Sequence, residues 1–321
     1  MRTHPGSTTR PGARALAIAL ALAIGAAWVA GSTPAAAVTG PLRVLAGPED
    51  QFLPSTNGTY LIWTQNSVSR PNRFRAFGKI RGTTEVFQLN EAGTQGYAGG
   101  IDPDQDRAIY QQIEGTSSDL YTISLEDPRS RTRLGPKINT AFREWGPKIS
   151  NRYFLFARDA SLKTSILLYD RVAKTIQRLA SRDLATVYLA PGSVGERYAT
   201  WSACTPTDCD AFIYDAQAGT TDPVPAPVGK GNYAPLAHED DGQLFFVRSG
   251  PACGATVRIL RLPLETLTKT PVTLTTLPSG IDAGYQLSFE DVAGQVDLWF
   301  SRYRCAAGQG DLYRLRDVGV P

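Results

Sequence analysis

The chain has 321 residues, of which 42% are hydrophobic and 20% charged, and this composition excludes a disordered or collagen-like protein. The formal net charge is +3, but three arginines lie within the first 14 residues, so the chain after residue 37 carries 30 basic and 30 acidic groups. A neutral surface gives little attraction to nucleic acid or to anionic lipid, so neither is expected as a partner.

The first 37 residues have the pattern of an export signal. Residues 1–14 are basic without any acid, residues 15–30 are an apolar run of 16, and Ala35 and Ala37 have the small-residue spacing that signal peptidase requires. The apolar run is shorter than the roughly 20 residues that span a bilayer. We therefore predict a signal peptide over 1–37, cleaved after Ala37, and no membrane insertion of the mature chain. The sequence predicts a secreted, extracellular protein.

The mature chain repeats with a period of about 46 residues. Six short apolar runs with alternating polarity read as the second strand of each repeat, and a polar turn precedes each of them. Their starts are separated by 47, 46, 45, 45 and 54 residues. The runs begin at Tyr60, Arg107, Tyr153, Tyr198, Gln243 and Asp297.

This spacing predicts an all-β fold, a six-bladed β-propeller of four-stranded antiparallel blades over residues 38–321. The last repeat ends before a fourth strand, whereas residues 42–46 form a strand without a partner of its own. We therefore expect residues 42–46 to complete the last blade and to remove an open sheet edge. The predicted blades cover residues 47–91, 94–135, 140–180, 184–226, 229–277 and 281–317.

Several repeats resemble the TolB-like, WD-repeat-like propeller family. The matching stretches begin at Asp102, Trp145 and Glu239, and third strands end on Tyr169-Asp170 and Tyr214-Asp215. The copies are degenerate, since none holds an intact Ser-Pro-Asp-Gly. The resemblance implies an exported bacterial propeller that binds a partner and lacks the α/β domain of TolB itself.

The four cysteines predict disulfide bonds, because the chain is exported. Three connectivities are possible, and the pairing Cys204–Cys209 with Cys253–Cys305 needs the least chain travel. No histidine lies near these loops, so a zinc site is not expected. We expect no metal and no cofactor.

Catalytic residue types are scarce in the mature chain. Its single histidine, His238, falls in a predicted turn, where we expect it to be solvated. Paired carboxylates are the only catalytic route that the sequence offers, and a carbohydrate-active enzyme, a glycosidase or lyase, is therefore the alternative function. It would use Glu144 together with Asp50 or Asp282.

Aromatic residues recur once per predicted inner strand and are the main candidates for ligand binding. If they face the channel they form a funnel for a peptide or a sugar, with Arg143 and Glu144 as polar contacts. If they pack between blades they belong to the core, and alternation alone leaves both readings open. The ring consists of Phe52, Tyr97, Trp145, Tyr188, Tyr233 and Tyr285.

The sequence thus favours a monomeric, non-enzymatic binding module. The expected partner is an extracellular or cell-envelope protein, a peptide or a cell-wall glycan, held at one mouth of the propeller channel.

Overall fold

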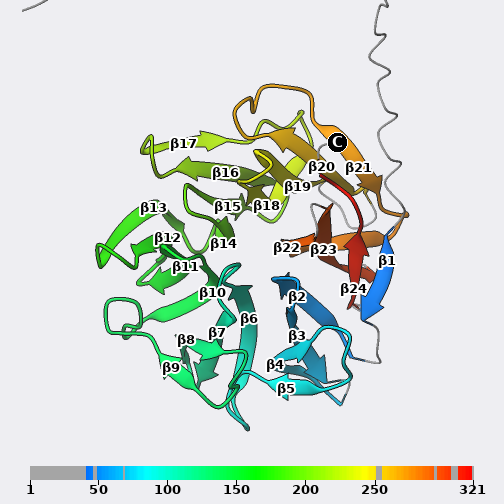
Figure 1. The fold of residues 1–321 in the computed structure, drawn as a ribbon. Coiled ribbons are helices and arrows are strands. Elements are labelled where there is room, and N and C mark those ends of the chain that lie inside the picture. The colour runs from blue at the N-terminus through cyan, green and yellow to red at the C-terminus, as the bar shows by residue number, and fades with distance from the viewer. Residues whose placement is uncertain are drawn as a thin grey trace, which may run out of the picture. The chain divides into compact units, whose positions relative to one another are not determined.

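A computed structural model describes residues 41–45, 49–67, 69–250, 255–292, 295–304 and 310–319. The predicted signal peptide lies outside these residues. All regular structure in the described ranges is β-strand, as predicted, and they contain no helix that could cross a membrane. The strands form antiparallel sheets arranged as a propeller-like ring (Figure 1).

Four of the sheets have four strands each. Three of them take their strands consecutively from the chain, and the fourth combines the C-terminal strands with β1. The first contains β2 (Gln51–Thr56), β3 (Tyr60–Ser67), β4 (Arg70–Ile80) and β5 (Val86–Gln88). The next two contain β14 (Tyr188–Val194), β15 (Tyr198–Cys204), β16 (Cys209–Asp215) and β17 (Thr220–Pro223), then β18 (Gly231–His238), β19 (Gln243–Ser249), β20 (Arg258–Pro263) and β21 (Val272–Thr276). The last contains β22 (Ile281–Val292), β23 (Gln295–Arg304), β24 (Gly310–Leu315) and β1 (Leu42–Leu45).

The remaining eight strands form one sheet, so the prediction of six separate four-stranded sheets is confirmed only in part. Two antiparallel meanders meet where Arg143 of β10 forms a parallel bridge with Ser118 of β8. The first meander is β6 (Gln95–Ile101), β7 (Arg107–Glu114), β8 (Ser117–Ser124) and β9 (Arg131–Arg133), and the second is β10 (Arg143–Ile149), β11 (Tyr153–Ala160), β12 (Lys163–Asp170) and β13 (Thr175–Asp183).

The hydrophobic core lies between neighbouring groups of strands. The second strands carry most of it, because their side chains alternate between two packed faces. Trp63, Trp201 and Trp299 lie on such strands and are at most 2% exposed, so their side chains belong to the core. One cluster joins Leu61 and Trp63 of β3 to Trp299 and Leu312 of the last sheet, so the core continues across the two ends of the chain.

The strands that lie toward the centre of the ring in Figure 1, which we call the inner strands, are β2, β6, β10, β14, β18 and β22. Buried hydroxyl groups accept hydrogen bonds from backbone N–H groups of these strands. Ser55 Oγ accepts a hydrogen bond from Ile101 N at 3.0 Å, and Ser193 Oγ accepts one from Ala237 N at 3.0 Å. Each bond joins the inner strand of one sheet to the inner strand of the next. A buried backbone N–H without an acceptor would destabilise the fold, so these bonds help to hold the inner strands side by side.

The ring is closed by contacts between the first and the last sheets. Thr56 N donates to Ser288 Oγ at 3.3 Å, and Arg81 forms an ion pair with the buried Glu290. The predicted N-terminal strand is also present, since β1 pairs with β24 in antiparallel register. Val44 and Leu45 of β1 pack against the cluster that contains Trp63 and Trp299.

Deleting residues 42–45 should lower the free energy of unfolding by about 2–3 kcal/mol, since it removes two partly buried side chains and exposes the edge of β24. We expect a fall in the melting temperature of roughly 5–10 °C, measured by circular dichroism. Leu42→Ser, at a side chain that is 49% exposed, is the control and should change the melting temperature little. An unchanged midpoint for the deletion would contradict this role of β1.

Candidate functional site

All six inner strands contain a register shift relative to the strand beside them. In β2 the shift lies between Phe52 and Ser55, in β10 between Trp145 and Lys148, and in β18 between Tyr233 and Leu236. A bulge of this kind bends a strand and re-aims its side chains. The remaining shifts lie between Ala98 and Gly100, Pro191 and Val194, and Ala283 and Leu287.

The backbone at these bulges is tightly constrained. Leu53, Gly146 and Ala234 have φ angles of 54°, 60° and 50°, and each directly precedes a proline. Such a conformation is unfavourable for a residue with a side chain and persists only where the surroundings enforce it. At Gly99 a Cβ atom would lie 2.4 Å from the carbonyl oxygen of Pro147, so this bulge requires glycine.

Four of the predicted ring residues line one cavity, which we call the aromatic cavity. Phe52, Tyr97, Trp145 and Tyr188 surround a volume of about 290 Å³ near the N-terminal ends of four inner strands. Arg143, Gln111, Lys148 and Gln286 also line it. A cavity of this size accommodates one ring-sized group, so it suits the binding of one small group of a ligand.

The aromatic side chains form two groups. Trp145 and Tyr188 stack with ring centroids 4.7 Å apart, and Trp145 Nε1 donates to Asp159 Oδ1 at 3.0 Å. The other two lining aromatics, Phe52 and Tyr97, are bridged by Phe74, whose ring centroid lies 5.6 Å from that of Phe52 and 5.0 Å from that of Tyr97. Burial raises the pKa of Tyr97, while the positive charge of Arg143 opposes that shift. The indole ring of Trp145 is thus oriented by both its hydrogen bond to Asp159 and its stack on Tyr188.

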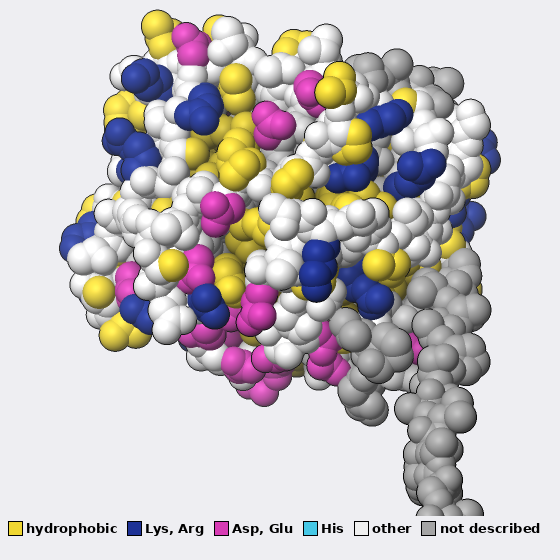
Figure 2. All heavy atoms as spheres, turned by 90° about the horizontal axis from the view of Figure 1, so that it is seen from above, with side chains coloured by type: hydrophobic (Ala, Val, Ile, Leu, Met, Phe, Trp, Pro, Cys, Tyr) yellow, Lys and Arg dark blue, Asp and Glu magenta, His cyan; other side chains and the backbone are white. Residues whose placement is uncertain are grey.

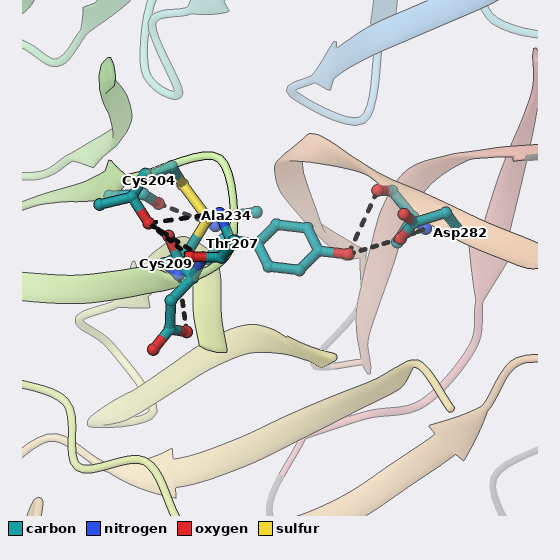
Figure 3. Close-up of a disulfide and its surroundings, with 10 residues drawn as sticks. Cys204, Thr207, Cys209, Ala234 and Asp282 are labelled. Atoms are coloured by element: carbon teal, nitrogen blue, oxygen red, sulfur yellow. Dashed lines mark hydrogen bonds between the residues drawn. A yellow bond between two sulfur atoms is a disulfide. The ribbon is translucent and has the colours of Figure 1, made fainter. Parts of the chain in front are cut away.

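The other two predicted ring residues do not line this cavity. Tyr233 is 4% exposed, belongs to the hydrophobic core, and donates from its hydroxyl to Asp282 Oδ1 at 2.6 Å (Figure 3). The core reading is thus right for Tyr233, whereas Trp145 takes part in both the core and the cavity. The side chain of Tyr285 lies outside the described residues.

The structure gives Arg143 and Glu144 different positions. Arg143 lines the aromatic cavity, with a side chain that is 54% exposed and 3.6 Å from Asp159. Glu144 is fully buried, and its carboxylate accepts hydrogen bonds from Arg158 Nε at 2.7 Å and from Thr140 Oγ1 at 2.6 Å. Glu144 is therefore engaged below the cavity surface and does not line the cavity.

The three carboxylates of the alternative enzyme function are not gathered in one cavity. Asp50 lines a separate cavity, which we call the third cavity. There it accepts hydrogen bonds from Asn66 Nδ2 and Gly310 N. Asp282 accepts a hydrogen bond from the Tyr233 hydroxyl, and Glu144 accepts one from Arg158. The third cavity adjoins the aromatic cavity, because both are lined by Phe52 and Leu53.

Lys148 and Gln286 separate the aromatic cavity from a second cavity at the opposite ends of the inner strands. Both residues line both cavities, and Lys148 Nζ donates to Gln286 Oε1 and to Gly99 O. Gln286 Nε2 in turn donates to Pro54 O at 2.9 Å and Gly99 O at 3.0 Å. Sequence reasoning missed this pair, which forms the floor of the aromatic cavity.

The second cavity has about 250 Å³ and a different charge. Its lining includes Asp104, Asp240, Glu290 and Asp291, and Lys148 is the one basic residue among the part of the lining that the structure describes. In the view of Figure 2 acidic side chains gather along one margin of the molecule, while Lys and Arg side chains are spread over the rest. The two cavities therefore differ in the charge of the ligand that each would favour.

Two further sequence predictions are tested by the structure. The Cys204–Cys209 disulfide is present and clips the β15–β16 hairpin, whereas Cys253 and Cys305 lie outside the described residues (Figure 3). The prediction that His238 is solvated is wrong. His238 ends β18, is 1% exposed and packs edge-on against Phe289, with ring centroids 4.3 Å apart.

A ring of antiparallel sheets with cavities at both ends of its inner strands is the architecture of a β-propeller. Among solved structures, the chain is similar to TolB from Acinetobacter baumannii, with a TM-score of 0.55 and 11% identity over 81% of this chain and 64% of that chain. It is similar to a putative TolB from Agrobacterium tumefaciens, with a TM-score of 0.57 and 13% identity over 84% and 91% of the two chains.

The similarity extends to an enzyme. An oligogalacturonate lyase from Vibrio parahaemolyticus matches with a TM-score of 0.51 and 10% identity over 85% of this chain and 80% of that chain. No protein-family model and no curated protein matches the sequence. These comparisons confirm the TolB-like propeller fold, and at such low identities they establish no activity.

Proposed function

We propose that the protein is an exported, non-enzymatic binding module that holds a partner at the aromatic cavity. The observation that carries this proposal is that Phe52, Tyr97, Trp145 and Tyr188, from four different inner strands, line one cavity. Aromatic rings offer stiff apolar area at small entropic cost, which is why they dominate binding sites. A protein, a peptide or a cell-wall glycan is the partner class.

The proposal extends to the number of blades, the cellular compartment and the oligomeric state. We count the eight-stranded sheet as two blades, which gives six, and the six inner strands with equivalent bulges support that count. The disulfide supports an oxidising compartment outside the cytoplasm, as a cleaved signal peptide over 1–37 requires. We propose that the protein acts as a monomer and needs no cofactor.

The alternative of a carbohydrate-active enzyme has less support. Glycosidases hold two carboxyl groups about 5 to 10 Å apart across one cleft. Here no Asp or Glu is among the described residues that line the aromatic cavity. Because Glu144 and Asp282 have their own buried or partly buried partners, the binding function is the one that the geometry favours.

Replacing Tyr188 should test the binding function directly. Tyr188 is 48% exposed, so Tyr188→Ala should leave the fold intact while removing one face of the Trp145 stack. The partner is first captured from the wall fraction or secretome on the immobilised wild-type protein. We expect Tyr188→Ala to bind it about 30-fold more weakly, a loss of ~2 kcal/mol in binding free energy. Dissociation constants of the purified full chain can be measured by biolayer interferometry.

Val172→Ala is the matched control for this experiment. Val172 is 78% exposed in the turn between β12 and β13, and it does not line the aromatic cavity. The control should bind like the wild type. Equal binding by Tyr188→Ala and the wild type would refute the proposed site.

A further inference from the structure

The aromatic cavity has a one-sided charge. Arg143 and Lys148 are the charged residues in its lining. Asp159, which does not line the cavity, accepts a hydrogen bond from Trp145 Nε1 and lies 3.6 Å from Arg143. A ligand group that enters this cavity therefore meets the guanidinium of Arg143 and the amino group of Lys148, and no carboxylate among the described lining residues.

Lys148 is held at the cavity floor at a substantial cost to the fold. The residue is 7% exposed, and burial lowers the pKa of its ammonium group to about 7. Its Nζ donates to Gly99 O and Gln286 Oε1, both uncharged acceptors. Since an ammonium group has three N–H bonds, one donor remains for a ligand. A buried lysine without a carboxylate partner is a feature typical of binding and catalytic sites.

A second buried donor in the lining has no acceptor. Gln111 is 3% exposed, and its Nε2 atom makes no hydrogen bond in the described structure. Gln111 pairs with Tyr97 in the β6–β7 register, which places it beside the aromatic rings. An unsatisfied buried amide is unfavourable, and a ligand oxygen would relieve that cost. As two hydrogen-bond donors, Lys148 and Gln111 together favour a ligand group that only accepts hydrogen bonds.

The adjoining third cavity offers polar atoms of another kind. Gln51 Oε1 and Ser301 Oγ line it, are buried, and have no hydrogen-bond partner in the described structure. It continues from the aromatic cavity past Phe52 and Leu53. An amide oxygen and a hydroxyl suit the N–H and C=O groups of a peptide backbone, so a chain rather than a single small molecule fits the two cavities together.

We propose that the aromatic cavity captures the free C-terminus of a peptide that ends in an aromatic or large apolar residue. The terminal side chain packs against Trp145 and Tyr188, and the terminal carboxylate accepts hydrogen bonds from Lys148 and Gln111. The preceding residues run past Phe52 into the third cavity. This inference rests on the proposed function, because it names the partner of the same site.

The same observations favour a peptide over a glycan. Sugar hydroxyls donate as well as accept, and a sugar site needs acceptors close to the ring. The aromatic cavity provides cationic and amide donors, while its apolar lining comes from Phe52, Leu53, Ala98, Ala190 and Pro191 in addition to the stacked rings. A peptide C-terminus fits this lining, because its carboxylate can accept from the donors and its apolar side chain can pack against the apolar residues.

A matched pair of peptides tests the proposal. Isothermal titration calorimetry with the full chain would compare acetyl-Gly-Gly-Trp as the free acid with the same peptide as its amide. We expect the acid to bind about 30-fold more tightly, because a charge-assisted hydrogen bond is lost in the amide. N-acetyl-tryptophan, which lacks the preceding residues, should bind more weakly than the longer acid, and glucuronic acid should not compete.

Variants separate the inference from the function on which it rests. Lys148→Met should reduce the affinity for the acid to that for the amide, leaving the amide unchanged, whereas Lys163→Met, at an exposed residue of β12, should alter neither. Tyr188→Ala should weaken both peptides. Equal binding of acid and amide to the wild type would overturn the carboxylate inference alone.

Three other results would also decide the matter. Binding of neither peptide, together with partner retention that depends on Tyr188, would overturn the peptide inference and leave the proposed function standing. Binding of N-acetyl-tryptophan as tight as that of the longer acid would replace the peptide by a small aromatic acid. Competition by glucuronic acid would place a glycan in the site instead.

Discussion

Glu144→Ala should unfold far more easily than the wild type, with a loss of about 3–5 kcal/mol in the free energy of unfolding. The carboxylate is fully buried and is bonded to Arg158 and Thr140. Its removal leaves the guanidinium of Arg158, which is 17% exposed, without a counter-charge. Denaturant unfolding followed by tryptophan fluorescence would measure the change.

An exposed ion pair on the same sheet provides the control for Glu144. Two nitrogens of Arg133 donate hydrogen bonds to the Asp119 carboxylate, but the arginine side chain is 52% exposed. Asp119→Ala should therefore cost less than about 1 kcal/mol. If the two substitutions were equally mild, the buried ion pair of Glu144 with Arg158 would not have the stabilising role that we expect.

Lys148 should make the protein more stable at alkaline pH than at neutral pH. Its pKa in the folded protein is about 7, below the ordinary 10.5, with burial as the cause. Between these values the unfolded state binds more protons, so the free energy of unfolding rises with pH, by about 1.4 kcal/mol per unit. Below pH 7 lysine is protonated in both states and this contribution is constant.

Lys148→Met isolates that effect from other titrating groups. The difference in unfolding free energy between the variant and the wild type should shrink by about 3 kcal/mol from pH 7 to pH 9.5. The variant should be the more stable protein near pH 6, because it buries no charge. Urea titrations at several pH values provide the measurement, and a difference independent of pH would show that Lys148 does not titrate in this range.

The fold was predictable from the sequence because strand alternation is a local signal. The runs that start at Tyr60, Arg107 and Tyr153 begin β3, β7 and β11 at the predicted residues. Their apolar faces recur at a period of two, which leaves little choice of secondary structure. The joining of two meanders through Arg143 and Ser118 was not predictable, because a single backbone bridge has no sequence pattern.

The candidate site was predictable only in part. Spacing located Phe52, Tyr97, Trp145 and Tyr188, but the bulges decide which of the six aromatics face the cavity, and neither Leu53 nor Ala234 signals a positive φ by its residue type. Phe74 was missed because it belongs to the long strand β4 and not to an inner strand. Lys148 could have been noticed as the lone charge between Trp145 and Ile149.

The pairing of β1 with β24 also determines the order in which the molecule can be completed. Arg43 donates a hydrogen bond to Asp311 across 268 residues of sequence, so β1 leaves the ribosome long before β24. Joining such distant segments has a large loop-closure entropy and is slow compared with forming a local hairpin. Each meander can therefore fold as the chain emerges, while β1 stays unpaired and the ring stays open until β24 has been synthesised.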